Sequence, residues 1–263
     1  MSSPTAGPPD TVLITGAARR IGRALALDLA RNGWRIAIHC RNSRGEAEEL
    51  AREIVSLGSS ATVLECDLAD ADAVSKLIPR CAEALAPPVC LINNASAFLP
   101  DSIAEMSEEI WNTHLDVNLR APVFLARALY AGLPAGRQGN VINIIDQRVW
   151  RLTPEFFSYT ISKSGLWTAT RTLAQAMAPR VRVNAIGPGP VLKSIHQTDD
   201  DFAAEAASTL LGRGPTPEEV AAAVRFILDA PALTGQMIAL DGGQHLRWAS
   251  EPHSGMTRSA KER

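Results

Sequence analysis

Tyr159 and Lys163 stand four residues apart in a segment whose apolar spacing predicts a helix. Residues at this spacing lie on one face of a helix, one turn apart. A free tyrosine has a pKa near ~10, and a neighbouring ammonium group lowers that pKa by stabilising the phenolate. The pair therefore predicts a proton donor beside the lysine that tunes it. An amphipathic surface helix without chemistry would have the same spacing.

Asp146 lies thirteen residues before Tyr159 and directly follows an apolar run, Val141 to Ile145, that predicts a buried strand. Open α/β sheets present ligand-binding groups at the carboxyl ends of their strands. A carboxylate there could face the tyrosine, cap the next turn, or pair with Arg148 or Arg151. The position alone leaves these roles open.

Asn118 interrupts the apolar stripe of a long predicted helix, Met106 to Tyr130. A buried asparagine needs hydrogen-bond partners. It is therefore either a satisfied structural group or part of a proton relay.

A glycine-rich turn, G-A-A-R-R-I-G from Gly16 to Gly22, joins the first predicted strand, Thr11 to Thr15, to a segment with helical spacing. Strand, glycine turn and helix form the dinucleotide-binding arrangement. In it, glycines let the backbone approach a pyrophosphate at the amino terminus of the helix. The alternative is a simple tight turn.

The end of the second predicted strand, Trp34 to Cys40, is the place where a bound dinucleotide has its adenosine ribose. An NAD-selective site would have an acidic residue there, whereas this chain has Arg41, Asn42 and Ser43. The missing carboxylate and the arginine favour a 2′-phosphate, and hence NADP(H). The alternative is that Arg41 is a solvated loop charge.

Two further strand ends contribute to the expected cofactor channel. Asp67 and Leu68 follow the third strand, Ala61 to Cys66, where the adenine ring would lie; alternatively, Asp67 is a turn-forming carboxylate. The small and polar residues of N-N-A-S-A-F-L-P follow the fourth strand, Pro88 to Ile92. Within this run Phe98 is either a core aromatic or a cleft residue that stacks on a planar ligand.

The later part of the chain continues the alternation of strands and helices. Val181 to Ile186 predicts a strand that ends in G-P-G-P-V, and Gln236 to Leu240 predicts the last one. Between them, Leu192 to Gly214 is irregular and polar, and we expect a mobile substrate lid. The chain is thus expected to be a single-domain, Rossmann-type α/β protein with a doubly wound parallel sheet of about seven strands flanked by helices.

This domain is expected to span residues 11–249, between a flexible leader at 1–10 and a polar tail at 250–263. Two features leave a choice open. The segment Gln147 to Thr153 could wall the substrate pocket or pack on a neighbouring subunit. Small residues in the tyrosine helix predict close packing against another helix or another subunit; they are Ser162, Ser164, Gly165 and Ala169.

The chain has 263 residues, 46% hydrophobic and 21% charged, enough for one large α/β domain. A formal net charge of -2 and a pI near 6.2 favour a small-molecule substrate over nucleic acid or an anionic membrane. No apolar run reaches the ~20 residues of a membrane span, and no metal-ligand cluster is visible. Cysteines without C-x-x-C spacing predict reduced, buried thiols and a cytoplasmic location. They are Cys40, Cys66, Cys81 and Cys90.

The motifs T-G-A-A-R-R-I-G, N-N-A-S, V-N-A-I-G-P-G and L-D-G-G occur in an order that resembles the short-chain dehydrogenase/reductase family. The resemblance runs from Thr11 to about Trp248 and includes Asn118, Tyr159 and Lys163. It implies that Tyr159 protonates the reduced group, that Lys163 lowers the tyrosine's pKa and binds the nicotinamide ribose, and that Asn118 anchors a relay water. It also implies a homotetramer. The expected NADP(H)-binding residues are Gly16, Arg19, Arg20, Ile21, Gly22, His39, Arg41, Asn42, Ser43, Asp67, Leu68, Asn94, Ala95, Ser96, Tyr159, Lys163, Pro188 and Gly189.

Two departures narrow the resemblance. The family usually has a third glycine where this chain has Arg20, and a serine where it has Asp146. Both changes occur together in the pteridine reductases and the bacterial dihydromonapterin reductases. The run N-N-A-S-A-F-L-P is similar to their N-N-A-S-x-F-x-P.

This closer resemblance implies NADPH-dependent reduction of a dihydropterin C=N bond, with Tyr159 supplying the proton, aided by Asp146 and Lys163. Arg20 would donate to the pterin carbonyl, Phe98 would stack on the pterin, and Ser96 would bond phosphate or pterin. The expected substrate-binding residues are Arg20, Ser96, Phe98, Asp146 and Tyr159. One alternative is an NADPH-dependent carbonyl reductase, in which Asp146 only polarises Tyr159. Another is a non-catalytic NADP(H)-sensing binding protein.

Overall fold

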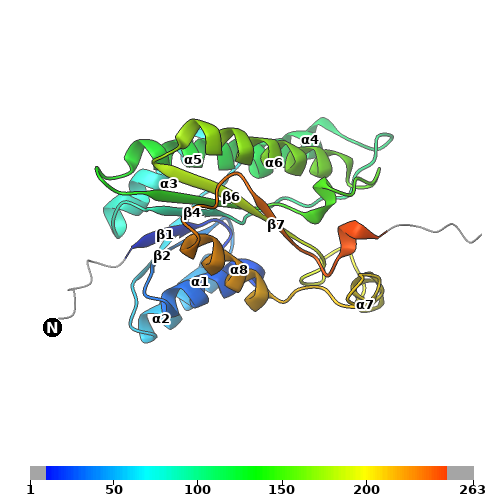
Figure 1. The fold of residues 1–263 in the computed structure, drawn as a ribbon, viewed down its shortest axis with the longest axis horizontal. Coiled ribbons are helices and arrows are strands. Elements are labelled where there is room, and N and C mark those ends of the chain that lie inside the picture. Colours follow the sequence, from blue (N-terminus) through cyan, green and yellow to red (C-terminus); the bar gives the residue numbers. More distant parts are fainter. Residues whose placement is uncertain (1–9, 248–263) are drawn as a thin grey trace, which may run out of the picture.

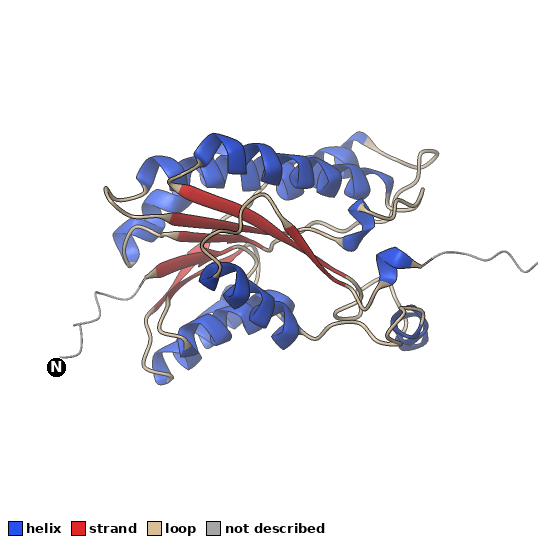
Figure 2. Ribbon diagram, viewed as in Figure 1, coloured by secondary structure: helices blue, strands red, loops and turns tan. Residues whose placement is uncertain are grey.

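Seven parallel strands form one sheet in the order β3-β2-β1-β4-β5-β6-β7 (Figure 2). The structure is a computed structural model that describes residues 10–247, so nearly all of the expected leader and the whole expected tail lie outside the described residues. The fold class predicted from the sequence is confirmed. The strands are β1 (Thr11–Ile14), β2 (Arg35–Cys40), β3 (Ala61–Glu65), β4 (Cys90–Asn93), β5 (Gly139–Ile144), β6 (Val181–Pro188) and β7 (Met237–Leu240).

Helices cover both faces of the sheet (Figure 1). Residues of the central strands alternate between the two layers: Val12 and Ile14 pack with α1, α2 and α8, and Leu13 packs with α3, α5 and α6. This two-sided burial explains why the strands are apolar runs rather than polar-apolar alternations. The helices are α1 (Arg20–Arg31), α2 (Arg44–Ser56), α3 (Ala71–Ala84), α4 (Glu108–Leu115), α5 (Ala121–Gly132), α6 (Phe157–Met177), α7 (Asp199–Ala207) and α8 (Pro217–Asp229).

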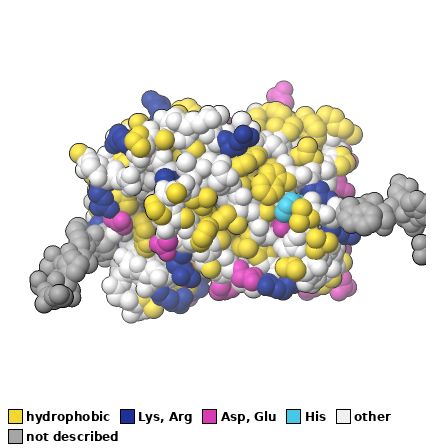
Figure 3. All heavy atoms as spheres, in the orientation of Figure 1, with side chains coloured by type: hydrophobic (Ala, Val, Ile, Leu, Met, Phe, Trp, Pro, Cys, Tyr) yellow, Lys and Arg dark blue, Asp and Glu magenta, His cyan; other side chains and the backbone are white. Residues whose placement is uncertain are grey.

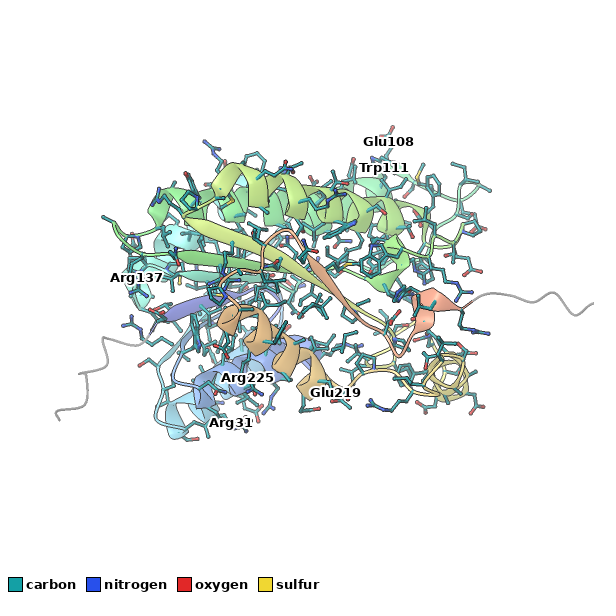
Figure 4. The ribbon with its side chains drawn as sticks, in the orientation of Figure 1. Arg31, Glu108, Trp111, Arg137, Glu219 and Arg225 are labelled. Atoms are coloured by element: carbon teal, nitrogen blue, oxygen red, sulfur yellow. The ribbon has the colours of Figure 1, made fainter. Side chains whose placement is uncertain are left out.

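The layer of α1, α2 and α8 is tied together by charge as well as by apolar packing. Arg225 of α8 donates a hydrogen bond of 2.8 Å to Asp28 of α1. Figure 4 labels Arg225 beside α1, and it labels Glu108 and Trp111 on α4 at the opposite edge of the molecule. In Figure 3, hydrophobic side chains gather over the middle of the visible face, where β7 crosses in Figure 1.

The long helix expected from Met106 to Tyr130 is not continuous. A π-helical segment, Asp116–Arg120, separates α4 from α5. Such a segment inserts one extra residue into the helix, and it occurs here at Asn118, whose side chain bonds the loop after β4. The interruption of the apolar stripe at Asn118 in the sequence therefore marks the place where the α-helix changes to a π-helix.

The segment from Leu192 to Gly214, expected to be irregular, contains α7. Thr198 caps this helix and forms a capping box with Asp201. The helix has no buried residues, so it lacks the apolar stripe by which a helix is recognised in a sequence. Its expected mobility stays a prediction.

The sheet order reverses between β1 and β4, and ligands of doubly wound sheets bind in the crevice at such a point. The glycine turn, the N-N-A-S run and Asp146 all follow carboxyl ends of neighbouring strands. Between residues 10 and 247, no helix is long and apolar enough to cross a membrane. The same part of the chain has no His, Cys, Asp and Glu group arranged to hold a metal ion.

Candidate active site

Tyr159 and Asp146 are in direct contact. Tyr159 lies in the first turn of α6, and its phenol donates a hydrogen bond of 2.9 Å to Oδ2 of Asp146. The other carboxylate oxygen, Oδ1, accepts the backbone N–H of Arg148 at 2.8 Å. Asp146 therefore faces the tyrosine and caps the short turn that follows it, and it forms no ion pair with Arg148 or Arg151. Two of the roles left open by the sequence are filled by the same side chain.

Lys163 lies one turn further along α6 and is 2% exposed. Its Nζ donates a hydrogen bond of 2.9 Å to the carbonyl of Ile144 and lies 5.7 Å from the centroid of the Tyr159 ring. The shared helix face predicted by the spacing is confirmed. The ammonium group is held by the end of β5 rather than by the phenol oxygen.

Three ionisable groups meet in this small volume, and each has a shifted pKa. Burial raises the pKa of Asp146. Burial, and then the Asp146 charge, raise the pKa of Tyr159 well above its usual value. Burial lowers the pKa of Lys163 to about 8, against the opposing pull of Asp146. The expected lowering of the Tyr159 pKa by Lys163 is therefore wrong for this arrangement, because burial and then the Asp146 charge raise that pKa.

Asn118 is fully buried and has hydrogen-bond partners at both ends of its amide. Its Oδ1 accepts the N–H of Ala97 at 2.8 Å, and its Nδ2 donates to the carbonyl of Ala97 at 2.9 Å and to Oγ of Ser162 at 3.1 Å. These bonds tie the loop after β4 to α6. Asn118 is thus a satisfied structural group, and its role in a water relay stays a prediction.

Small residues of α6 pack within the same chain. A Cβ at Gly165 would lie 2.9 Å from Leu119, and Ser162 bonds Asn118. The part of α6 with small side chains therefore packs closely against the π-helical segment of the same chain. Of the two alternatives, another helix or another subunit, this is the first.

Phe98 is partly buried in a cluster of aromatic rings. Its ring stacks on Phe156, with centroids 4.3 Å apart and planes 10° apart, and it meets the edge of Tyr159 at 4.7 Å. Phe156 has a left-handed backbone, φ 52, that is unusual outside glycine. The His196 ring also lies 6.4 Å from that of Phe98. Stacking of Phe98 on a planar ligand stays a prediction.

The glycine turn is held from two sides. Asn94 donates to the carbonyls of Thr15 and Gly16 at 2.8 and 3.1 Å. Gly16 has a positive φ, and its N–H donates to Nδ1 of His39 at 3.0 Å. A Cβ at Gly22 would lie 2.2 Å from the Gly16 carbonyl, so no side chain fits there.

His39 is buried and neutral. Its Nδ1 accepts the Gly16 N–H, so Nε2 carries the hydrogen and donates to the carbonyl of Cys66 at 3.0 Å. Burial lowers the pKa of His39 to about 4. His39 therefore links the glycine turn to the end of β3.

Arg20 stands at the position of the usual third glycine and has a left-handed φ of 55. Its guanidinium donates to the carbonyls of Lys193 and Leu192 at 2.8 and 3.0 Å. Arg20 therefore contacts the first residues of the expected lid. The neighbouring Arg19 pairs with Glu46 of α2.

The remaining expected cofactor residues lie at the carboxyl ends of strands or at the starts of the helices that follow them, and their contacts with NADP(H) stay a prediction. Arg41 and Asn42 are exposed after β2. Asp67 accepts the N–H of Ala69 at 2.9 Å, which is the turn-forming alternative. Others occupy equivalent ends: Ser43 before α2, Leu68 after β3, Ala95 and Ser96 after β4, Ile21 in the first turn of α1, and Pro188 and Gly189 at the end of β6.

The segment from Gln147 to Thr153 packs on its own chain. Trp150 contacts the rings of Trp167 and His245 at 6.4 and 5.2 Å. Arg151 donates to the carbonyl of Gln244 at 3.2 Å. The segment therefore connects α6 to the turn after β7 at the edge of the site.

Several residues of the site were not identified as such from the sequence. Phe156 covers Phe98, and Asp101, His114 and Ser158 form a buried cluster beside Tyr159. Asp101 follows the N-N-A-S run by only a few residues, which was the available signal. His114 and Ser158 give no signal, because each is one of several polar residues in its helix and nothing in the sequence marks it as buried.

The amino-acid sequence is similar to those of known reductases. The family model described as enoyl-(acyl carrier protein) reductase matches residues 16–245. A 3-oxoacyl-[acyl-carrier-protein] reductase of Synechocystis sp. is 31% identical over 91% of this chain and 98% of its own length.

Two of the similar solved structures have higher identities. FolM alternative dihydrofolate reductase 1 from Brucella suis, in complex with NADP, is 47% identical, with a TM-score of 0.89, and the match covers 92% of this chain and 97% of that one. The Brucella canis protein of the same name, also complexed with NADP, is 45% identical, with a TM-score of 0.88, over 94% and 98% of the two chains. A blue fluorescent protein from a metagenomic library, in complex with NADPH, is 28% identical, with a TM-score of 0.84, over 89% and 97%.

Proposed function

The chain belongs to the short-chain dehydrogenase/reductase family, and we propose that within this family it is an NADPH-dependent reductase of a dihydropterin C=N bond. The observation that carries the proposal is the hydrogen bond of 2.9 Å between Tyr159 and Asp146, where most of the family has a serine. The identity of 47% and 45% to two proteins named as alternative dihydrofolate reductases supports it.

The residues present fit NADP(H). Helix α1 begins without a side-chain cap, so its first N–H groups are available to a pyrophosphate. Gly22 leaves no Cβ in the turn, and Arg41 stands exposed at the end of β2 where an NAD-selective site has a carboxylate. In this proposal the turn holds the pyrophosphate, Arg41 holds the 2′-phosphate, and Lys163 holds the nicotinamide ribose. When bound, the cofactor supplies the hydride.

Protonation is the part of the reaction that the protein itself supplies. Reduction of a C=N bond places a hydride on carbon and a proton on nitrogen, and Tyr159 delivers that proton from its phenol. Burial raises the pKa of both Tyr159 and Asp146, and the phenol holds its proton at neutral pH until the substrate nitrogen takes it. After the transfer, the half-buried Asp146 carboxylate takes up a proton from solvent and passes it along the same hydrogen bond to the phenolate, which restores both groups.

Phe98 provides a surface for a flat substrate. One face of its ring is covered by Phe156, and its contact with Tyr159 at 4.7 Å places Phe98 beside the proton donor. In this proposal the pterin stacks on the other face of the ring. A bicyclic pterin fits such a face better than a flexible acyl chain, because aromatic rings gain from stacking. Arg20 and Ser96 complete the proposed substrate site, with Arg20 released from the lid carbonyls to donate to the pterin carbonyl.

Carbonyl reduction is the second candidate function. The Synechocystis relative, a 3-oxoacyl-[acyl-carrier-protein] reductase, favours it. In that case Asp146 only polarises Tyr159 and no proton passes through it.

The test is NADPH oxidation by the purified protein with dihydromonapterin, dihydrobiopterin and dihydrofolate, beside a panel of ketones and quinones. NADH serves as the cofactor control. Turnover of a dihydropterin with NADPH supports the proposal. Turnover of carbonyl compounds alone overturns the substrate assignment and leaves the second candidate.

We also propose a homotetramer, because α5 and α6 form an outer layer of the fold (Figure 1), and α5 has a half-exposed aromatic residue, Phe124, there. Light scattering on the eluting protein tests this assembly. The four cysteines are free and buried, which supports a cytoplasmic location.

A further inference from the structure

Three polar side chains from distant parts of the chain meet in the interior beside Tyr159. They are Asp101, from the loop after β4, His114, from α4, and Ser158, from the first turn of α6. Asp101 is 7% exposed, and the other two are 0% exposed. Buried polar groups are costly unless they are hydrogen-bonded, so the partners of each need to be identified.

The hydrogen bonds of the cluster have a single consistent direction. The N–H of Leu99 donates to Nε2 of His114 at 3.0 Å, so the imidazole hydrogen sits on Nδ1. Nδ1 then donates to Oγ of Ser158 at 2.6 Å, and the Ser158 hydroxyl donates to the Asp101 carboxylate. Every donor in this chain has an acceptor only if His114 is neutral and Asp101 is ionised. Burial lowers the pKa of His114, which favours the neutral ring.

Asp101 also replaces a missing helix cap. Helix α6 begins after Phe156, whose side chain cannot cap, and the structure has no side-chain cap at that residue. The N–H of Ser158 instead donates to Oδ2 of Asp101 at 3.1 Å. A carboxylate at the amino terminus of a helix is also favoured by the helix dipole. The start of α6 is therefore held by a residue of the loop that carries Phe98.

The cluster joins the two aromatic residues of the site. Leu99 directly follows Phe98, and Ser158 directly precedes Tyr159, so the chain of hydrogen bonds connects their backbones. The Phe98 and Tyr159 rings meet edge to face at 4.7 Å, and the His114 ring lies 5.9 Å from that of Tyr159.

We propose that Asp101, His114 and Ser158 are positioning residues that fix the phenol of Tyr159 against Phe98 and Asp146. The inference rests on the proposed function in one respect, that Tyr159 is the proton donor. It does not depend on which substrate is reduced.

The first test is Ser158→Ala, with Ser59→Ala as the matched control. Ser59 donates a hydroxyl hydrogen bond of 2.6 Å to the Trp34 carbonyl at the opposite edge of the sheet. With the best substrate of the panel, Ser158→Ala should lower kcat by about 10 to 100-fold, because small misplacements of a reacting group have effects of this size. The Kd for NADPH should change less than about twofold, and Ser59→Ala should keep both values. Unchanged kcat, or equal losses in kcat and NADPH binding, would overturn the proposal.

A second readout needs no substrate. The chain has two tyrosines, Tyr130 and Tyr159, so in a Tyr130→Phe background the phenolate absorbance near 295 nm belongs to Tyr159 alone. Adding Ser158→Ala should let the phenol leave its buried contact with Asp146, and the phenolate should appear at a pH lower by at least about half a unit. An unchanged titration would overturn the positioning role, whatever the substrate.

His114→Gln replaces Ser158→Ala if that variant does not fold. Its amide keeps an acceptor for the Leu99 N–H and removes the donor to Ser158, so the same losses in kcat and the same shift in titration are expected. A Tyr130→Phe protein that reduces nothing in the panel would count against the proposed function alone, because the titration still decides the inference.

Discussion

The phenol of Tyr159 donates a hydrogen bond of 2.9 Å to Asp146, and this bond places two groups with raised pKa values in one proton-sharing pair. Such pairs titrate together rather than as separate residues. The pair differs from a tyrosine beside a serine, because a carboxylate can take up a proton and pass it on near neutral pH, whereas a serine hydroxyl does not release its proton there. In the proposed reduction of a dihydropterin, the pair serves to deliver a proton to the ring nitrogen.

Tyr159→Phe should lower kcat by about 10²- to 10⁴-fold, the range for a lost general acid. NADPH binding should change little, because the phenol oxygen contacts Asp146 rather than the glycine turn. Steady-state rates and a fluorescence titration with NADPH measure the two effects. Equal losses of turnover and of cofactor affinity would assign Tyr159 to binding instead of proton transfer.

Lys163→Met tests the pKa of the buried ammonium group through stability. Burial lowers the pKa of Lys163 from 10.5 to about 8, so between these values the unfolded chain binds more protons than the folded protein. The stability contributed by Lys163 therefore grows as the pH rises through this window and is lost as the pH falls toward 8. Urea unfolding should show the wild-type protein gaining up to about 3 kcal/mol relative to Lys163→Met across the window. A difference between the two proteins that is the same at pH 8 and pH 10 would contradict the assignment.

Arg41→Ala should weaken NADPH binding by about 10- to 100-fold and leave NADH binding nearly unchanged, because only NADPH has the 2′-phosphate. Arg44→Ala is the control, since that arginine is already engaged by Glu48 and Glu65. Dissociation constants for both cofactors with both variants provide the measurement. An unchanged NADPH to NADH ratio in Arg41→Ala would mean that the phosphate is held elsewhere.

Gly22→Ala should abolish NADPH binding and destabilise the fold by about 1 to 3 kcal/mol, since its Cβ would lie 2.2 Å from the Gly16 carbonyl. Gly45→Ala is the matched control: Gly45 lies in α2, and a Cβ there meets nothing within 4 Å. That variant should be as stable as the wild type or more so, by up to about 1 kcal/mol. Thermal unfolding with and without NADPH compares them. Equal melting temperatures for the two variants would count against the close approach at Gly22.

The sheet could be predicted well from the sequence because its central strands are apolar runs buried on both faces, and turn-forming residues follow most strands. The pairing of Tyr159 with Lys163 on one helix face also follows from spacing alone. The position of Asp146 followed from the strand before it. Its bond to Tyr159 could not be separated from capping, because one carboxylate does both.

Several features that could not be predicted from the sequence depend on three-dimensional contacts and burial. The pKa of Tyr159 was expected to fall, because a sequence shows the lysine four residues away but not that its ammonium bonds Ile144. The helix α7 was missed because it buries no residue. Asp101 caps a helix 57 residues later in the chain, and no local pattern indicates such a cap.

The most direct test of the central claim is the effect of Asp146→Ser on two reactions of the same protein. Asp67→Ser, which removes a carboxylate from a turn at another strand end, is the control. If Asp146 returns a proton to Tyr159, kcat/KM for the dihydropterin should fall at least about tenfold more than kcat/KM for a simple ketone. A larger fall for the ketone, or equal falls for both substrates, would contradict the assignment of Asp146 to pterin reduction.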